Sequence, residues 1–129
     1  MLKLETLHLR ECRRLHTMCE FDTKMHHLHT LDLNRCWNLR SFKSLGNLYR
    51  LRILNLRGCF KLHMPNLAES VVQLHELQLL NLRKCGESDA FSESLGNLVQ
   101  LQVLHLEGVA SVPEYVGNLT QLKELYVEE

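Results

Sequence analysis

Leucine residues recur along this chain at regular intervals. The order is Leu-x-x-Leu-x-Leu, and after two more residues comes Cys in four copies and Val in a fifth. The copies are Leu4-Leu7-Leu9-Cys12, Leu28-Leu31-Leu33-Cys36, Leu51-Leu54-Leu56-Cys59, Leu77-Leu80-Leu82-Cys85, Leu101-Leu104-Leu106-Val109 and the shortened Leu122-Leu125-Val127. Their first leucines lie 24, 23, 26, 24 and 21 residues apart. A period of this size predicts a solenoid of stacked repeats.

Each Leu-x-Leu step alternates an apolar with a variable residue, as in Leu7-His8-Leu9 and Leu80-Asn81-Leu82. Such alternation predicts a short β-strand with the leucines inward and the intervening side chains outward. The period and the strands together predict an α/β repeat fold. We expect a leucine-rich-repeat solenoid with a parallel β-sheet on its concave face and short helical or irregular returns on its convex face.

Four of the returns share a sequence signature that predicts one or two helical turns. They are residues 42–48, 68–74, 92–98 and 113–119. Pro113 and Glu114 suit a first helical turn, and Gly followed by Asn suits a left-handed stop. The residues Met64-Pro65-Asn66 lengthen the third repeat, and we expect them to form a surface bulge. The return from His16 to Met25 is degenerate, so the first turn should be the least regular.

We expect one domain over residues 1–129, with about five full repeats and a truncated sixth. One repeat buries roughly 10 kcal/mol of apolar side chains, which is less than the backbone entropy of about 23 residues costs. Each repeat therefore depends on its neighbours. Solenoids normally carry polar caps, and neither end shows one. The pattern predicts an uncapped fragment of a longer array, in which bare strand edges could cause edge-to-edge self-association.

The overall charge is balanced, with 15 Lys and Arg against 15 Asp and Glu. This balance gives no reason to expect a nucleic-acid partner or an anionic membrane surface. No apolar run has membrane-spanning length, and residues 1–10 do not resemble a secretory signal. Five cysteines, four of them in one repeat position, indicate a reduced protein, so we expect a cytoplasmic, intracellular location.

The repeated cysteine position calls for a small side chain that enters the core where the chain leaves the strand. A thiol behaves as a small hydrophobe that can donate weakly to a buried carbonyl. Parallel strands about 4.8 Å apart hold Cβ atoms at about that separation, which is beyond the 3.5–4.5 Å that a disulfide prefers. We therefore predict free structural thiols.

Metal binding and catalysis find little support in the sequence. The first repeat holds a group that suggests zinc, namely Cys12, His16, Cys19, His26, His27 and His29. Their spacing lacks a Cys-x-x-Cys pair, so scattered surface histidines are the preferred reading. No phosphate-binding loop, His-Glu-x-x-His or Gly-x-Ser-x-Gly motif is present. We expect no enzyme, no cofactor and no metal.

The outward residues of stacked strands should form columns across the concave face. The columns are basic in repeats one to four and acidic in the last two, around an apolar strip of Ile53, Leu79 and Val103. Apolar anchors flanked by charges are typical of protein interfaces, although charges can also simply solvate a sheet. The candidate protein-binding residues are His8, Arg10, Asp32, Asn34, Arg35, Ile53, Asn55, Arg57, Leu79, Asn81, Arg83, Lys84, Val103, His105, Glu107 and Tyr126. Among these, Arg57, Arg83 and Lys84 are the strongest candidates.

The repeats resemble those of plant intracellular nucleotide-binding disease-resistance proteins (NB-LRR immune receptors). The resemblance rests on the Cys position, on Pro-Glu-x-Val or Ser-Glu-Ser-Leu before Gly-Asn-Leu, and on residues 52–59, Arg-Ile-Leu-Asn-Leu-Arg-Gly-Cys. It implies an effector-sensing and autoinhibitory segment acting in defence. The implied partners are a pathogen effector, a host protein or the nucleotide-binding domain of the same receptor.

Two alternatives remain at this stage. F-box substrate adaptors also place Cys in this position, but they follow it with an Ile-Thr-Asp-like segment that Arg13-Arg14-Leu15 and Trp37-Asn38-Leu39 do not match. A purely structural spacer that contacts no partner is the other alternative. Extracellular receptor-kinase repeats differ, since they have Asn in the Cys position and a Gly-x-Ile-Pro step that is absent here.

Overall fold

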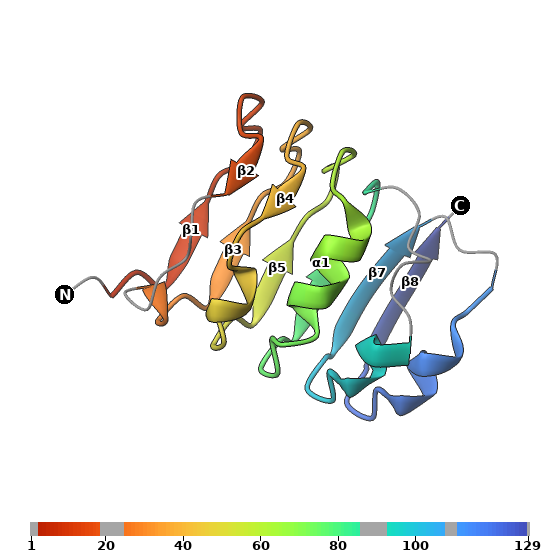
Figure 1. Ribbon diagram of the computed structural model, residues 1–129. Helices are drawn as coiled ribbons and strands as arrows, with labels where there is room; N and C mark the ends of the chain where they lie inside the picture. The colour runs from red at the N-terminus through yellow and green to blue at the C-terminus, as the bar shows by residue number, and fades with distance from the viewer. Residues whose placement is uncertain (1–2, 19–24, 86–92, 108–110, 129) are drawn as a thin grey trace.

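A computed structural model of the chain describes residues 3–18, 25–85, 93–107 and 111–128. Six strands form one sheet in which every neighbouring pair is parallel. They are β1 (Thr6–His8), β3 (Thr30–Asp32), β5 (Ile53–Asn55), β6 (Leu79–Asn81), β7 (Val103–Glu107) and β8 (Glu124–Glu128), in that spatial order. Sequence order and spatial order agree, as expected of a solenoid in which each repeat contacts only its neighbours (Figure 1).

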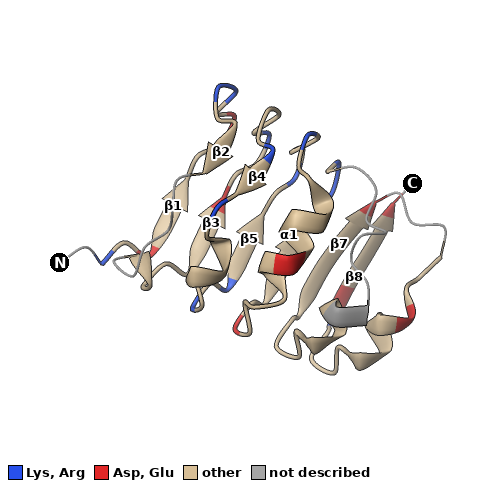
Figure 2. Ribbon diagram, in the orientation of Figure 1, with Lys and Arg blue, Asp and Glu red and all other residues tan. Residues whose placement is uncertain are grey.

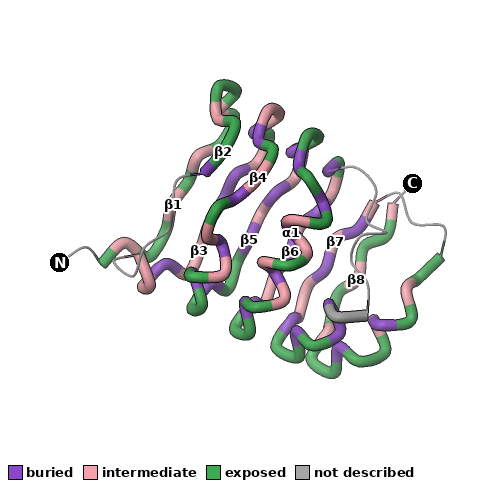
Figure 3. The backbone as a smooth tube through the Cα atoms, in the orientation of Figure 1, coloured by how far each residue is buried: buried purple, intermediate pink, exposed green. Residues whose placement is uncertain are grey.

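The strand register aligns the repeats without any slip. Leu31 pairs with Leu54, Leu54 with Leu80, and Leu80 with Leu104. All four side chains are fully buried, and Figure 3 shows buried residues recurring along successive strands. The predicted leucine-rich-repeat solenoid is therefore confirmed, with the leucines inward and the variable residues on the open face of the sheet.

The returns cover the other face of the sheet, as predicted (Figure 1). Three are short 3-10 helices, η2 (Leu45–Asn47), η4 (Glu93–Asn97) and η5 (Glu114–Asn118), and one is the α-helix α1 (Met64–Val71). Glu114 begins η5 as predicted, whereas Pro113 is the N-cap residue with extended backbone and lies just before the first turn in which it was expected. Leu45, Leu67 and Tyr115 on these elements are buried against the leucine core.

The prediction of a surface bulge at Met64-Pro65-Asn66 is wrong. These residues form the first turn of α1, which begins four residues before the predicted return. Proline is tolerated in a first helical turn, and the Nδ1 of His63 accepts a hydrogen bond from the main-chain N–H of Asn66 at 3.3 Å. Met64 is only 7% exposed and joins the core, whereas Pro65 on the same turn is exposed.

A second ladder on the return side was not predicted. It pairs β2 (Thr17–Met18) with β4 (Ser41–Phe42) in parallel. Two-residue strands are too short to show a sequence period. Most of the return from His16 to Met25, expected to be the least regular, lies outside the described residues.

The predicted left-handed stops at Gly-Asn are also wrong. Gly46, Gly96 and Gly117 lie within η2, η4 and η5, and none has a positive φ. The described left-handed residues instead occupy one repeated position, the residue before each cysteine. They are Glu11 (φ 59°), Arg35 (φ 61°), Gly58 (φ 80°) and Lys84 (φ 56°). This position turns the chain out of the strand and aims the following cysteine at the core.

The cysteine position joins successive repeats through the core. The Sγ atoms of Cys36, Cys59 and Cys85 donate to the main-chain carbonyls of Leu9, Leu33 and Leu56 at 2.9, 3.2 and 2.7 Å. All three thiols are unpaired with other cysteines and buried, which agrees with the predicted structural role. Cys12 is only half-buried, so its interpretation as a core residue holds less well.

Candidate protein-binding face

The open face of the sheet presents the predicted columns in the predicted register. His8 pairs with Asp32, Asp32 with Asn55, and Asn55 with Asn81; His105 and Tyr126 continue the same column. The apolar strip is continuous too, because Ile53 pairs with Leu79 and Leu79 with Val103. Ile53 is 37% exposed, and Leu79 and Val103 are half-buried. The centre of the face therefore offers apolar surface on β5, β6 and β7.

Three polar residues of the column that runs from His8 to Tyr126 form hydrogen bonds with their own backbone. Asp32, Asn55 and Asn81 each accept a hydrogen bond through Oδ1 from the main-chain N–H two residues later, at 3.0, 3.1 and 3.1 Å. A side-chain oxygen that binds its own chain in this way fixes the turn at the end of the strand. These residues shape the face, and their Oδ1 atoms have less capacity for a partner.

At the amino-terminal end, Asp32 contacts an arginine and a histidine side chain. Arg10 Nε lies 2.6 Å and His8 Nδ1 lies 3.5 Å from Asp32 Oδ2. The Asp32 side chain is only 6% exposed, because these neighbours cover it. Arg35 forms an exposed pair with Glu11 at 3.6 Å, a kind of contact that contributes little to stability. The predicted site residues His8, Arg10, Asp32 and Arg35 thus already have polar partners within the chain.

At the carboxyl-terminal end, Arg83 crosses an intervening strand. Its Nη2 atom donates to Glu128 Oε2 at 2.8 Å, two repeats away (Figure 2 shows the acidic residues on β7 and β8). The rings of His105 and Tyr126 stack at 4.4 Å with an interplanar angle of 7°. Lys84 donates its main-chain N–H to a carboxylate oxygen of Glu107. Sequence reasoning placed these residues side by side but could not foresee their pairing.

The surroundings of His105 shift its proton affinity. Burial lowers the pKa of this imidazole below its ordinary value, and the charge of the nearby Arg83 lowers it further. Its Nδ1 atom is buried without a hydrogen-bond partner among the described residues, as are Arg83 Nε and Asn34 Oδ1. The neutral imidazole is thus favoured, which suits a ring stacked face to face on tyrosine.

Arg57 differs from the other arginines of the face. Arg10 and Arg83 are held by carboxylates, whereas the Arg57 side chain makes no hydrogen bond or ion pair with any described residue. It lies between them in the same column of outward residues, and Asn55 separates it from Ile53 of the apolar strip. Of the predicted cationic candidates, Arg57 is therefore the guanidinium best able to bind a carboxylate of a partner.

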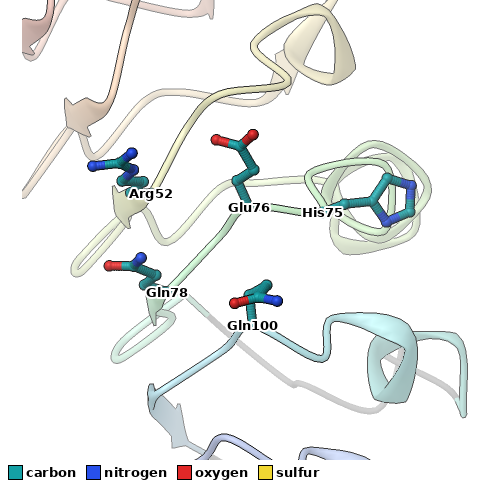
Figure 4. Close-up of a pocket in the computed structure, with 5 residues that line it drawn as sticks. All are labelled: Arg52, His75, Glu76, Gln78 and Gln100. Atoms are coloured by element: carbon teal, nitrogen blue, oxygen red, sulfur yellow. The ribbon is translucent and has the colours of Figure 1, made fainter.

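A hollow of about 350 Å³ opens at the edge where the strands begin. Arg52, His75, Glu76, Gln78 and Gln100 line it (Figure 4). Arg52 and Gln78 directly precede β5 and β6, and none of the five was a predicted site residue. The sequence did contain a signal for polar residues at this edge. The residue after the first leucine of the repeat is polar at Arg52, Gln78 and Gln102. This open hollow can bind polar groups, but it provides no enclosed site for a small molecule.

The described residues give no support to the zinc hypothesis. Among them, no three His, Cys, Asp or Glu side chains gather in a way that could hold a metal ion, and Cys19 lies outside this part of the chain. No helix within the described ranges is long and apolar enough to cross a membrane.

Known proteins share this repeat pattern over most of the chain. Disease resistance protein RML1A of Arabidopsis thaliana is 26% identical over 78% of this chain and 10% of its own length. Disease resistance protein RRS1 of the same plant is 28% identical over 81% of this chain and 12% of its own. The chain thus spans about a tenth of each relative, and the predicted resemblance to plant disease-resistance proteins is confirmed.

A solved structure resembles the fold as well. The internalin InlF of Listeria monocytogenes superposes with a TM-score of 0.51 at 14% identity, over 80% of this chain and 36% of that protein. At this identity the likeness concerns the fold alone. Residues 3–129 match the family described as "Leucine-rich repeat region". The chain therefore belongs to the leucine-rich repeat region family, whose repeats form scaffolds for protein interaction.

Proposed function

We propose that this chain is a non-enzymatic recognition segment of a plant intracellular immune receptor, which binds a protein through the open face of its sheet. Family membership supports the protein-binding role, because stacked repeats create an extended surface from variable strand residues. The disease-resistance role rests on the two Arabidopsis relatives, whose names carry it. The proposed compartment is the cytoplasm, which the buried reduced cysteines support.

One observation carries the choice of surface. Arg57 has no ion-pair partner among the described residues, and it follows β5, whose Ile53 is an aliphatic residue that is 37% exposed. An exposed apolar side chain and an unpaired guanidinium on the same repeat fit a protein partner that offers a carboxylate and an aliphatic or aromatic side chain. Leu79 and Val103 extend the apolar surface across the next two repeats.

Three partners suit this proposal: a pathogen effector, a host protein, or the nucleotide-binding domain of the same receptor. Binding that domain would hold the receptor inactive, and binding an effector or a host protein would supply sensing. In each case the same central residues would act as the anchor. The remaining site residues, His8, Arg10, Asp32, Asn34, Arg35, Asn55, Asn81, Arg83, Lys84, His105, Glu107 and Tyr126, would shape or flank it.

Site-specific photo-crosslinking tests the surface directly. A photoreactive amino acid replaces Ile53 on the open face or, as the matched control, Glu69 on α1, which is exposed on the other side of the sheet. In plant leaf lysate we expect a discrete protein adduct from position 53 and none of that mass from position 69. Arg57→Glu should abolish the adduct while leaving the far-ultraviolet circular dichroism unchanged. Equal labelling from both positions, or no adduct from either, would favour a structural spacer, and an adduct at position 53 that survives Arg57→Glu would overturn the role given to Arg57.

A further inference from the structure

A second surface lies along the edge of the array where the chain leaves the strands. Each Cys-x-x-Leu segment there is a four-residue turn, closed by a hydrogen bond from the leucine N–H to the cysteine carbonyl. The distances are 3.1 Å for Leu15–Cys12, 3.1 Å for Leu39–Cys36 and 3.3 Å for Leu62–Cys59. Because both ends of the turn pack toward the core, its two middle residues project away from it.

The middle residues of successive turns contact one another. The guanidinium of Arg13 lies 4.5 Å from the centre of the Trp37 ring. Asn38 Nδ2 donates to the Arg13 carbonyl at 2.6 Å, and Lys61 Nζ donates to Asn38 Oδ1 at 2.9 Å. These contacts join three repeats into one continuous surface. We name it the turn ridge and define it by Arg13, Arg14, Trp37, Phe60 and Lys61.

Phe60 makes the turn ridge unusual. It is 56% exposed, more than any other described Phe, Trp or Tyr residue, and it follows a fully buried cysteine. Trp37, in the same position of the preceding repeat, has its ring covered by Arg13 and is only partly exposed. Phe60 is thus a large apolar ring that projects from a turn near cationic side chains. Such a residue is typical of an interface anchor.

The charge around the turn ridge is strongly one-sided. The segments 12–16, 36–40 and 59–63 hold four Lys or Arg and no acidic residue. Figure 2 shows Lys and Arg on the loops along this edge. An incoming chain with carboxylates would therefore meet a favourable potential along the whole ridge.

We propose that the turn ridge docks an acidic protein segment that carries one large apolar side chain. That side chain covers the exposed face of Phe60, while carboxylates on either side pair with Arg14 and Lys61. The surface is separate from the open face of the sheet and includes none of the open-face residues discussed above. It allows the repeats to hold a second partner, or a second part of the same partner, at the same time.

Single-stranded nucleic acid fits the turn ridge less well. Such ligands need bare aromatic faces in succession to stack their bases, and Arg13 already occupies the Trp37 ring. Residues 86–129 hold eight Asp or Glu against one Lys, which would repel a phosphate backbone that continued along the array. A protein segment needs only a short stretch of acidic residues at the basic end.

The test uses the 129-residue chain and fluorescein-labelled 12-residue peptides, followed by anisotropy at 50 mM salt. One peptide is rich in Glu with a central Phe, and a second has Ser in place of that Phe; a 12-mer of oligo-dT is the nucleic-acid probe. We expect the Phe peptide to bind at least 10-fold more tightly than both other probes. The single tryptophan, Trp37, should report binding through its own fluorescence.

Two double variants locate the binding. F60S/K61E should weaken the Phe peptide at least 10-fold. The matched control Y49S/R50E removes a half-exposed aromatic and its neighbouring cation from the edge where the strands begin, and it should leave affinity unchanged. All four residues are exposed, so both variants should keep the thermal transition of the parent.

Three outcomes would overturn the proposal: equal weakening by the two double variants, no preference for the Phe peptide, or tighter binding of oligo-dT. Arg57→Glu separates this proposal from the open-face proposal, since it should abolish the open-face adduct and leave the peptide affinity within twofold.

Discussion

Cys85 donates its thiol to the main-chain oxygen of Leu56, 2.7 Å away, and so bonds one repeat to the repeat before it. The same oxygen also accepts the main-chain N–H of Cys59, at 3.1 Å, within its own turn. A carbonyl has two lone pairs, so one oxygen can both close a turn and receive the next repeat. The repeated spacing of the cysteines thus has a physical basis in this chain, because Cys36, Cys59 and Cys85 each link two repeats.

Removing one of these thiols should destabilise the array. Cys59→Ala deletes a fully buried sulfur that donates to Leu33 at 3.2 Å. The lost hydrogen bond and the small cavity should lower the free energy of unfolding by about 1–3 kcal/mol. Cys12→Ala, in the same repeat position but half-buried, should cost less than about 0.5 kcal/mol. Urea unfolding followed by circular dichroism measures both, and equal losses would contradict the proposed link.

The buried thiols also predict instability in alkali. Burial raises the pKa of Cys85 to about 12 and raises that of Cys59 as well, from an ordinary value of 9.0. An unfolded chain therefore loses these protons at lower pH than the folded chain does. The stability that the thiols contribute is complete below pH 9 and is lost as pH rises toward 12, by at most about 1.4 kcal/mol per pH unit for each thiol.

Urea unfolding between pH 8 and 10 checks this slope, with C59A/C85A as the variant that should flatten it. Tyr115, whose pKa burial raises to about 12, adds a similar loss only above pH 10. A C59A/C85A variant whose stability falls as steeply as that of the parent chain would show that other groups control the alkaline transition.

The repeat period determined what could be predicted from sequence. Leu31, Leu54 and Leu80 could be assigned to the core because a period of two within a period of about 24 leaves one arrangement for them. The columns of the open face follow from the same register. Their contacts do not: Arg83 reaches past the adjacent strand to Glu128, and a sequence column carries no information on where a long side chain ends.

The turns were harder to predict because their signal is carried by backbone conformation. Glu11, Arg35 and Lys84 adopt left-handed φ values that side chains other than Gly and Asn rarely take. Only Gly58 marks this position by residue type among the described copies. The sequence instead predicted left-handed residues at the Gly-Asn pairs, although their glycines lie in ordinary 3-10 helices.

Gly58 should be sensitive to substitution where other glycines are not. At φ 80° an added Cβ is strained, and it would lie 3.3 Å from the Cα of Arg35. Gly58→Ala should therefore cost about 1–2 kcal/mol of unfolding free energy. Gly117→Ala is the matched control, since that glycine lacks a positive φ and has open space around its Cβ. It should be neutral or stabilising by up to about 1 kcal/mol. Thermal unfolding of the two variants shows whether the loss of stability comes from backbone strain at Gly58 or from replacing any glycine with alanine.

His105 should make the carboxyl-terminal repeats sensitive to mild acid. Burial and Arg83 lower the pKa of this imidazole, so the folded chain takes up its proton at lower pH than the unfolded chain. The stability that results is complete above about pH 6.5 and is lost as pH falls through the lowered value. The slope cannot exceed about 1.4 kcal/mol per pH unit, and partial solvent exposure reduces it. Urea unfolding from pH 7.5 to 5 should show His105→Gln with a flatter profile than the parent, whereas His75→Gln, at an exposed turn, should match it. If His105→Gln kept the full slope, the stacked pair with Tyr126 would not be the acid-sensitive contact.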